Sequence, residues 1–202
     1  MRAIRWAVLG GWMLVGFGCA TASAVRVGTP ALRQVPPQTE VRAYDVAGAS
    51  EAELRLQLDK VAPVDANGAR HDAYTHWFVK WNFPFARSAA GCATGPVTIT
   101  LTVSMDLPRW VDAASGEDAL KARWQEYLDS LVTHEVGHRA HGAQAGAEIE
   151  RALPLLPAQP SCEEMERIAN LAGDAVLARF RQADLDYDAK TDHGATQGAR
   201  FP

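Results

Sequence analysis

The sequence predicts an α+β domain in which a small antiparallel sheet packs on two helices. Segments with the two-residue alternation of strands lie in the first half of the chain, and segments with helical spacing of apolar residues lie in the second half. Strands followed by helices, rather than alternating with them, are typical of the α+β class. The 202 residues are enough for one domain with a core of ordinary size.

Residues 1–24 have the pattern of an export signal. Arg2 and Arg5 precede an apolar stretch interrupted by glycines, and residues 22–24 (Ala-Ser-Ala) provide the small side chains of a cleavage site. Because that stretch is too short for a good membrane span, we predict a periplasmic or secreted protein with no transmembrane segment in the mature chain. The alternative is a lipid anchor at Cys19, although the sequence lacks the leucine expected three residues before a lipidated cysteine.

Charge and cysteine content restrict the partners and the compartment. The formal net charge is −4, and loss of Arg2 and Arg5 would take it to −6 (−4 − 2). A mildly acidic chain gives no indication of nucleic acid as a partner. Cys92 and Cys162 remain after processing, and two such cysteines normally pair in an oxidising compartment. A zinc site made of cysteines is disfavoured because the chain has no CxxC pair.

The strands and the first helix precede the middle of the chain. Residues 25–40 have no periodicity and are predicted to form a flexible N-terminal arm before a domain of residues 41–202. After a short strand that ends at residue 46, Ser50 and Glu53 form a capping box that begins a helix to about residue 60.

Two predicted strands follow that helix. Residues 75–81 place Trp77, Val79 and Trp81 on one face, and residues 97–104 alternate aliphatic side chains with Thr or Ser. One apolar and one polar face is typical of an antiparallel sheet.

Two helices are predicted in the second half. Residues 117–151 carry an apolar stripe at helical spacing that leads into Glu135, and Pro154 ends the helix. Ser161 and Glu164 form another capping box, which begins a helix to about Phe180. The acidic, Gly-containing residues 184–202 are predicted to be loop.

The most specific motif is His134-Glu135-Val136-Gly137-His138. HExxH on a helix places two imidazoles on one face, where both can bind a single zinc ion, and places the glutamate beside the metal-bound water. A solvated surface helix is the alternative. It is disfavoured because these polar groups enter a partly buried face, which is costly without a compensating partner.

The spacing of residues in the sequence does not by itself identify the third zinc ligand. Catalytic zinc normally has three protein ligands and one water. His141 lies on the same face as His134, but it is about 10 Å farther along the helix. Glu163 or Glu166 from the following helix would complete a gluzincin-type site, and His193 in the tail is another candidate. The aspartates around His193 fit a calcium loop poorly, because Ala189 and Ala195 occupy its glycine and glutamate positions. They would instead orient a zinc-bound His193.

Further motifs spread over residues 41–202 carry a family resemblance. They are Tyr44-Asp45-Val46 with Gly48, Glu53-Leu54-Arg55, Thr75 with Trp77 and Trp81, Cys92, Leu107-Pro108-Arg109-Trp110, the HExxH motif, Cys162, Tyr187 to Gly194, and Gln197-Gly198. With these the chain resembles a bacterial family of predicted secreted zinc-dependent proteases. The resemblance implies a zincin-like fold, His134 and His138 as zinc ligands, and Glu135 as general base. Because the closing His-Gly element belongs to the family pattern, it also implies His193 as the third ligand.

The sequence therefore predicts a zinc metallopeptidase that acts on a peptide or protein substrate. Tyr187, His141 and Arg139 are candidates for stabilising the transition state, and strand 97–104 is a candidate edge for an extended substrate. One alternative is a non-catalytic secreted module with structural zinc, although a closed four-ligand site has no use for the glutamate. Another is a zinc amidase that acts on cell-wall peptides.

Overall fold

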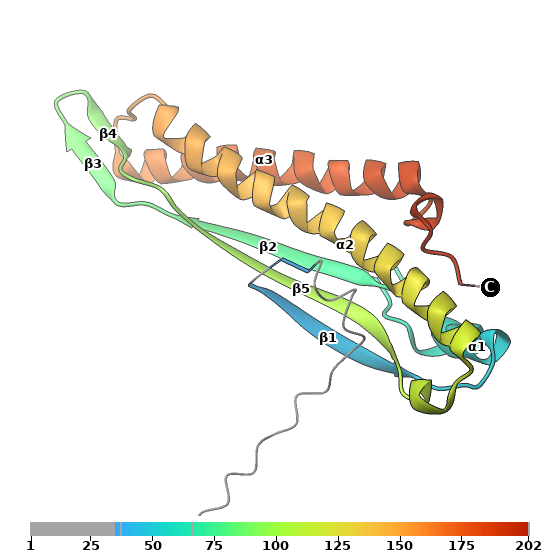
Figure 1. Ribbon diagram of the computed structural model, residues 1–202. Coiled ribbons are helices and arrows are strands. Elements are labelled where there is room, and N and C mark those ends of the chain that lie inside the picture. The colour runs from blue at the N-terminus through green and yellow to red at the C-terminus, as the bar shows by residue number, and fades with distance from the viewer. Residues whose placement is uncertain (1–34, 37, 66, 202) are drawn as a thin grey trace, which may run out of the picture.

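The computed structural model describes residues 35–36, 38–65 and 67–201, and it has the predicted α+β class (Figure 1). The predicted export signal and residues 25–34 and 37 of the predicted arm lie outside the described residues. The elements are β1 (Thr39–Val46), α1 (Glu51–Val61), β2 (Tyr74–Asn82), β3 (Phe85–Ser88), β4 (Gly91–Thr94), β5 (Thr98–Trp110), α2 (Asp118–Ala152) and α3 (Cys162–Thr191), with short 3-10 turns at Ala113–Ser115, Leu153–Leu155 and Ala195–Gln197. β1 includes residues 39 and 40, which the sequence had assigned to the arm.

The main sheet is mixed, with strand order β1-β5-β2. β2 is antiparallel to β5, with Trp77 opposite Val103, but β1 is parallel to β5, with Thr39 opposite Val103. The prediction of a purely antiparallel sheet was therefore wrong for β1. Parallel neighbours need a long crossover, and here α1, β2 and the β3–β4 hairpin lie in the connection between the two strands.

β5 continues six residues beyond the predicted end at Ser104. Its pairing with β2 ends at Asp106, so Pro108 has a strand neighbour only on the β1 side. A proline lacks the N–H of a ladder hydrogen bond, and it is tolerated where one edge of the strand is unpaired. The same topology makes β5 the central strand. β2 pairs with it from Thr98 to Asp106, but β1 pairs with it only from Val103 onward, so one edge of residues 98–102 has no strand partner among the described residues, and the predicted binding of an extended substrate there stays a prediction.

α2 and α3 lie side by side on one face of the sheet (Figure 1). α2 has the predicted extent within one residue at each end, but α3 runs eleven residues beyond the predicted end at Phe180. Residues 184–191 are therefore helix and not loop. The helix ends where Asp192, His193 and Gly194 all have positive φ angles, of 52°, 51° and 83°. A left-handed turn of this kind is a common helix stop.

Two apolar clusters hold the helices on the sheet. The first joins α1, β5 and the start of α2, and it includes Leu54, Met105 and Tyr127. The second joins β2, the end of α2 and α3, and it includes Ile149 and Met165. On α2 the first cluster ends at residue 136 and the second begins at residue 145. The HExxH motif thus lies where the two clusters meet.

The predicted pairing of Cys92 with Cys162 is confirmed, with a Cα–Cα distance of 5.1 Å. The bridge joins β4 to the first residue of α3, and Cys92 also exchanges backbone hydrogen bonds with Gln159. The β3–β4 hairpin is therefore attached to the start of α3 (Figure 1). In the described part of the chain, no helix combines the length and apolar character that crossing a membrane requires.

Candidate metal centre

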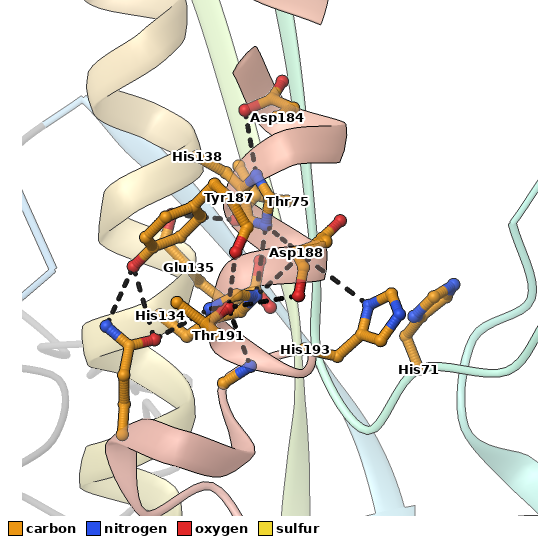
Figure 2. Close-up of polar contacts among 12 residues, drawn as sticks. His71, Thr75, His134, Glu135, His138, Asp184, Tyr187, Asp188, Thr191 and His193 are labelled. Atoms are coloured by element: carbon orange, nitrogen blue, oxygen red, sulfur yellow. Dashed lines mark hydrogen bonds and ion pairs between the residues drawn. The ribbon is translucent and has the colours of Figure 1, made fainter. Parts of the chain in front are cut away.

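The HExxH motif is buried in the middle of α2. His134 and Glu135 are each 3 % exposed, and His138 is 8 % exposed. The two imidazoles point toward α3, where Asp184 and Asp188 stand one turn apart and point back (Figure 2). The site is thus built from two i, i+4 pairs on two facing helices.

Three of these side chains converge on one point. Asp188 Oδ1 lies 3.0 Å from His134 Nε2 and 3.0 Å from His138 Nε2, and the two Nε2 atoms are 3.1 Å apart. The three atoms form a nearly equilateral triangle of metal-ligating types. His134, His138 and Asp188 therefore make a buried group that could hold a metal ion.

The hydrogen bonds on the other side of each ring set its tautomer. His138 Nδ1 donates to Asp184 Oδ1 at 2.9 Å, and His134 Nδ1 donates to Gln197 Oε1 at 3.0 Å. The Gln197 amide is itself oriented, because its Nε2 donates to the Tyr187 hydroxyl at 3.0 Å. With Nδ1 protonated, each neutral imidazole presents a lone pair at Nε2. Two such lone pairs and a carboxylate oxygen can meet only around a cation or an additional proton.

Asp184 orients two imidazoles at once. Its Oδ1 accepts from Nδ1 of His138 and from Nδ1 of His141 at 2.7 Å, and its Oδ2 accepts from the Trp77 indole at 2.7 Å. Ligand atoms of His138, His141 and Asp184 also lie within 4.8 Å of one another. Because three N–H donors already occupy the Asp184 carboxylate, its role here is to fix the ring of His138.

Charge in the site shifts the pKa values of His138 and Asp188 in opposite directions. Burial by itself lowers the pKa of His138, but the carboxylates of Asp184 and Asp188 outweigh it and raise that pKa to about 10. Burial by itself raises the pKa of Asp188, but the two imidazoles outweigh it and hold that pKa well below its ordinary value. The site therefore favours a positive charge between an anion and two imidazoles.

Glu135 is the buried group whose hydrogen bonding is incomplete. Its Oε2 has no hydrogen-bond partner among the described residues, and burial raises the pKa of its carboxyl group. It lines a cavity of about 550 Å³ together with His134, His138 and Asp188. Thr75, at the start of β2, also lines the cavity and donates its hydroxyl to the backbone oxygen of Glu135 at 3.2 Å. A buried acceptor without a donor is normally satisfied by water or a ligand.

The three predicted transition-state groups lie away from this cavity, since none of them is among its lining residues. Tyr187 stacks on the His134 ring with a centroid distance of 4.9 Å and an interplanar angle of 9°. His141 binds Asp184, and Arg139 Nε donates to Thr39 Oγ1 at 3.0 Å. Tyr187 also explains the glycine of the motif, because a Cβ on Gly137 would come within 2.5 Å of its hydroxyl oxygen.

The candidates for the third ligand have different positions. His193 is not in the triangle: its side chain is 60 % exposed, and its Nδ1 lies 3.7 Å from Asp188 Oδ1. Glu163 and Glu166 lie in the first turns of α3, at least 22 residues before Asp188. That separation is about 33 Å along a helix, so neither glutamate can share an ion with the two histidines. The group instead takes Asp188, a residue to which the sequence reasoning gave only an orienting role.

A family match spans most of the described chain. Residues 41–194 match a family described as bacterial protein of unknown function, DUF922. The chain belongs to this family. The matched stretch contains the HExxH motif, Asp184 and Asp188, whereas Gln197 lies beyond it. No curated protein and no solved structure matches the chain. Membership in DUF922 confirms that the chain belongs to a bacterial family of unknown function, whereas the predicted protease and zincin character of that family stays a prediction.

Proposed function

We propose that this DUF922 protein is an exported zinc-dependent peptidase in which His134, His138 and Asp188 bind the metal. The triangle of ligand atoms beside a buried, unpartnered glutamate oxygen is the main support. Two neutral imidazoles and a carboxylate are a donor set that suits zinc. The disulfide is consistent with an oxidising compartment.

The number of ligands favours a catalytic site over a structural one. Among the described residues, the group that contains His134 has three members, and no fourth side chain joins it. A structural zinc site is closed by four protein ligands, whereas a catalytic site keeps one position for water. Glu135 faces the same cavity as the three ligands, where a general base would be needed.

The protein side chains have separate roles in hydrolysis. Zinc bound here would lower the pKa of a water molecule and polarise the scissile carbonyl. Glu135 takes a proton as the water oxygen adds to the carbonyl carbon. It then delivers that proton to the nitrogen as the C–N bond breaks, which releases a carboxylic acid and an amine. Burial raises the pKa of Glu135 above its ordinary value, which makes its carboxylate a stronger proton acceptor than an exposed glutamate.

We infer that Tyr74 donates to the developing oxyanion. It lines the cavity at the start of β2, and no described residue forms a hydrogen bond with its hydroxyl. Burial, followed by nearby carboxylates, raises the pKa of Tyr74. The phenol therefore remains a donor at neutral pH, in the role predicted from the sequence for Tyr187, His141 or Arg139.

The test is Glu135→Gln in zinc-loaded protein, with casein and peptidoglycan as separate substrates. We expect the variant to keep its zinc and to lose turnover by roughly 100-fold to 10,000-fold, the usual contribution of a general base. Glu150→Gln is the matched control, because Glu150 is an exposed glutamate on the same helix. Full activity in Glu135→Gln would refute the assigned base. Cleavage of peptidoglycan but not of casein would favour the amidase alternative.

A further inference from the structure

Two different elements form the walls of the cavity next to the proposed metal site. One wall is the segment 69–75, which leads into β2, and the other is the face of α3 that carries Arg181, Leu185 and Asp188. β2 is an edge strand of the described sheet. The cavity therefore lies between a strand edge and a helix, with the HExxH helix behind it.

Five carboxylates of the described residues line this cavity; Glu135 has the unpartnered Oε2 described above, and the other four have partners. Asp72 binds Arg55 through two hydrogen bonds of 2.6 and 2.7 Å, and Asp192 binds Arg200 at 2.8 Å. The other two, Asp184 and Asp188, bind the imidazoles of the HExxH motif. None of the four is free to compensate another charge on the walls.

The two arginines of the lining lack an acidic partner. Arg70 donates Nη1 to the Ala62 carbonyl at 2.6 Å, and within the described residues neither Arg70 nor Arg181 forms an ion pair. Other described arginines do so: Arg42, Arg55, Arg109, Arg123, Arg167, Arg179 and Arg200 each pair with a carboxylate. In a chain of formal charge −4, each wall of this cavity thus carries an exposed arginine that has no ion-pair partner among the described residues.

We propose that this cavity selects peptides with acidic side chains on either side of the scissile bond, and that Arg70 and Arg181 are the specificity residues. This inference rests on the proposed peptidase function. A divalent ion would balance Asp188 and Glu135, so that the two guanidinium groups would set the sign of the potential experienced by a substrate.

The spacing along α3 indicates which substrate residues are read. Arg181 is seven residues before Asp188, or about 10 Å along the helix. An extended peptide advances about 3.3 Å per residue, so the guanidinium lies about three residues from the bond to be cut. Leu185, which is 61 % exposed, stands between them and offers an apolar contact.

The test measures binding in zinc-loaded Glu135→Gln, so that it does not depend on turnover. Three labelled peptides are compared by fluorescence anisotropy. They are identical except for Glu, Gln or Lys at the positions three residues on either side of the central bond. We expect the Glu peptide to bind roughly tenfold tighter than the Gln peptide, and the Lys peptide to bind most weakly. The preference should shrink as salt is added.

Charge reversal then assigns the preference to its residues. Arg181→Glu and Arg70→Glu should each reduce the preference for Glu over Gln roughly threefold, and the double variant should abolish or invert it. Arg87→Glu on the distant β3–β4 hairpin is the matched control, because it makes the same change of net charge outside the cavity lining. That control should leave the preference unchanged.

The outcomes separate this inference from the proposed function. Equal binding of the three peptides, or a preference that persists in the double variant, would overturn the inference alone. Selective binding of the Glu peptide by a protein that never cleaves it when Glu135 is intact would overturn the peptidase and leave the acidic-ligand site. No binding of any peptide would count against both.

Discussion

Replacing Asp188 with asparagine removes the negative charge from the proposed metal group and keeps its shape. Asp188 Oδ1 is 3.0 Å from both Nε2 atoms, so the amide can keep an oxygen in the same place. Loss of a group that only orients a metal ligand typically costs 10-fold to 100-fold in metal affinity. Loss of a direct ligand should reduce metal affinity by at least the upper value of this range. We therefore expect a fall in zinc affinity of at least about 100-fold, or about 2.7 kcal/mol.

The assay is competition for zinc with a chromophoric chelator, together with metal analysis after gel filtration. His193→Asn is the parallel variant. Because the exposed His193 ring lies 3.7 Å from Asp188 Oδ1 and outside the triangle, we expect its zinc affinity to stay within about threefold of the unsubstituted protein. If Asp188→Asn kept tightly bound zinc while His193→Asn lost it, the ligand set would be wrong and the assignment of His193 would be restored.

Three other predictions follow from the packing and charge of the site. Gly137→Ala should destabilise the fold by about 1 kcal/mol in urea unfolding, because the overlap with Tyr187 costs about 1–3 kcal/mol and the gain in helix propensity returns about 1 kcal/mol; a net gain in stability would show that the Tyr187 ring yields easily. Replacing Cys92 and Cys162 with serine should lower the free energy of unfolding by about 4 kcal/mol and leave zinc stoichiometry unchanged, because the bridge is at the opposite end of α3 from the metal group; loss of zinc would contradict this separation. Zinc affinity measured by calorimetry should rise about tenfold per pH unit above neutrality, because a proton held by His138 with a pKa of about 10 must leave when the metal binds; a flat profile between pH 7 and 9 would refute it. The same raised pKa stabilises the metal-free fold below about pH 6.5, and that contribution is lost as the pH rises toward 10.

Local signals predicted the elements well where each element depends on its own residues. The capping boxes at Ser50 and Ser161 accept hydrogen bonds from Glu53 and Glu164, as predicted. The length of α2 followed from its apolar stripe. The parallel pairing of β1 with β5 could not be predicted, because it depends on where a long connection returns the chain.

One half of the metal group has a strong local sequence signal, and the other half depends on tertiary packing. The HExxH half of the triangle was visible because both histidines lie in a strongly periodic helix. The other half was hidden because residues 184–191 are polar and have little helical stripe of their own. They are helical because they pack on α2, where Asp184 and Asp188 meet the histidines. Had that segment been predicted as a helix, the i, i+4 spacing of the aspartates would have indicated a facing pair.

The packing of Phe201 links residues 197–201 to the orientation of His134, which lies far from them in sequence. Phe201 is 7 % exposed, and the centroid of its ring lies 5.4 Å from that of Trp124 and 5.1 Å from that of Tyr127. This anchor holds the preceding turn against α2, where Gln197 reaches His134. Loss of the Phe201 ring would therefore loosen one imidazole while every ligand stayed intact. The durability of bound metal during storage would then depend on a single aromatic anchor.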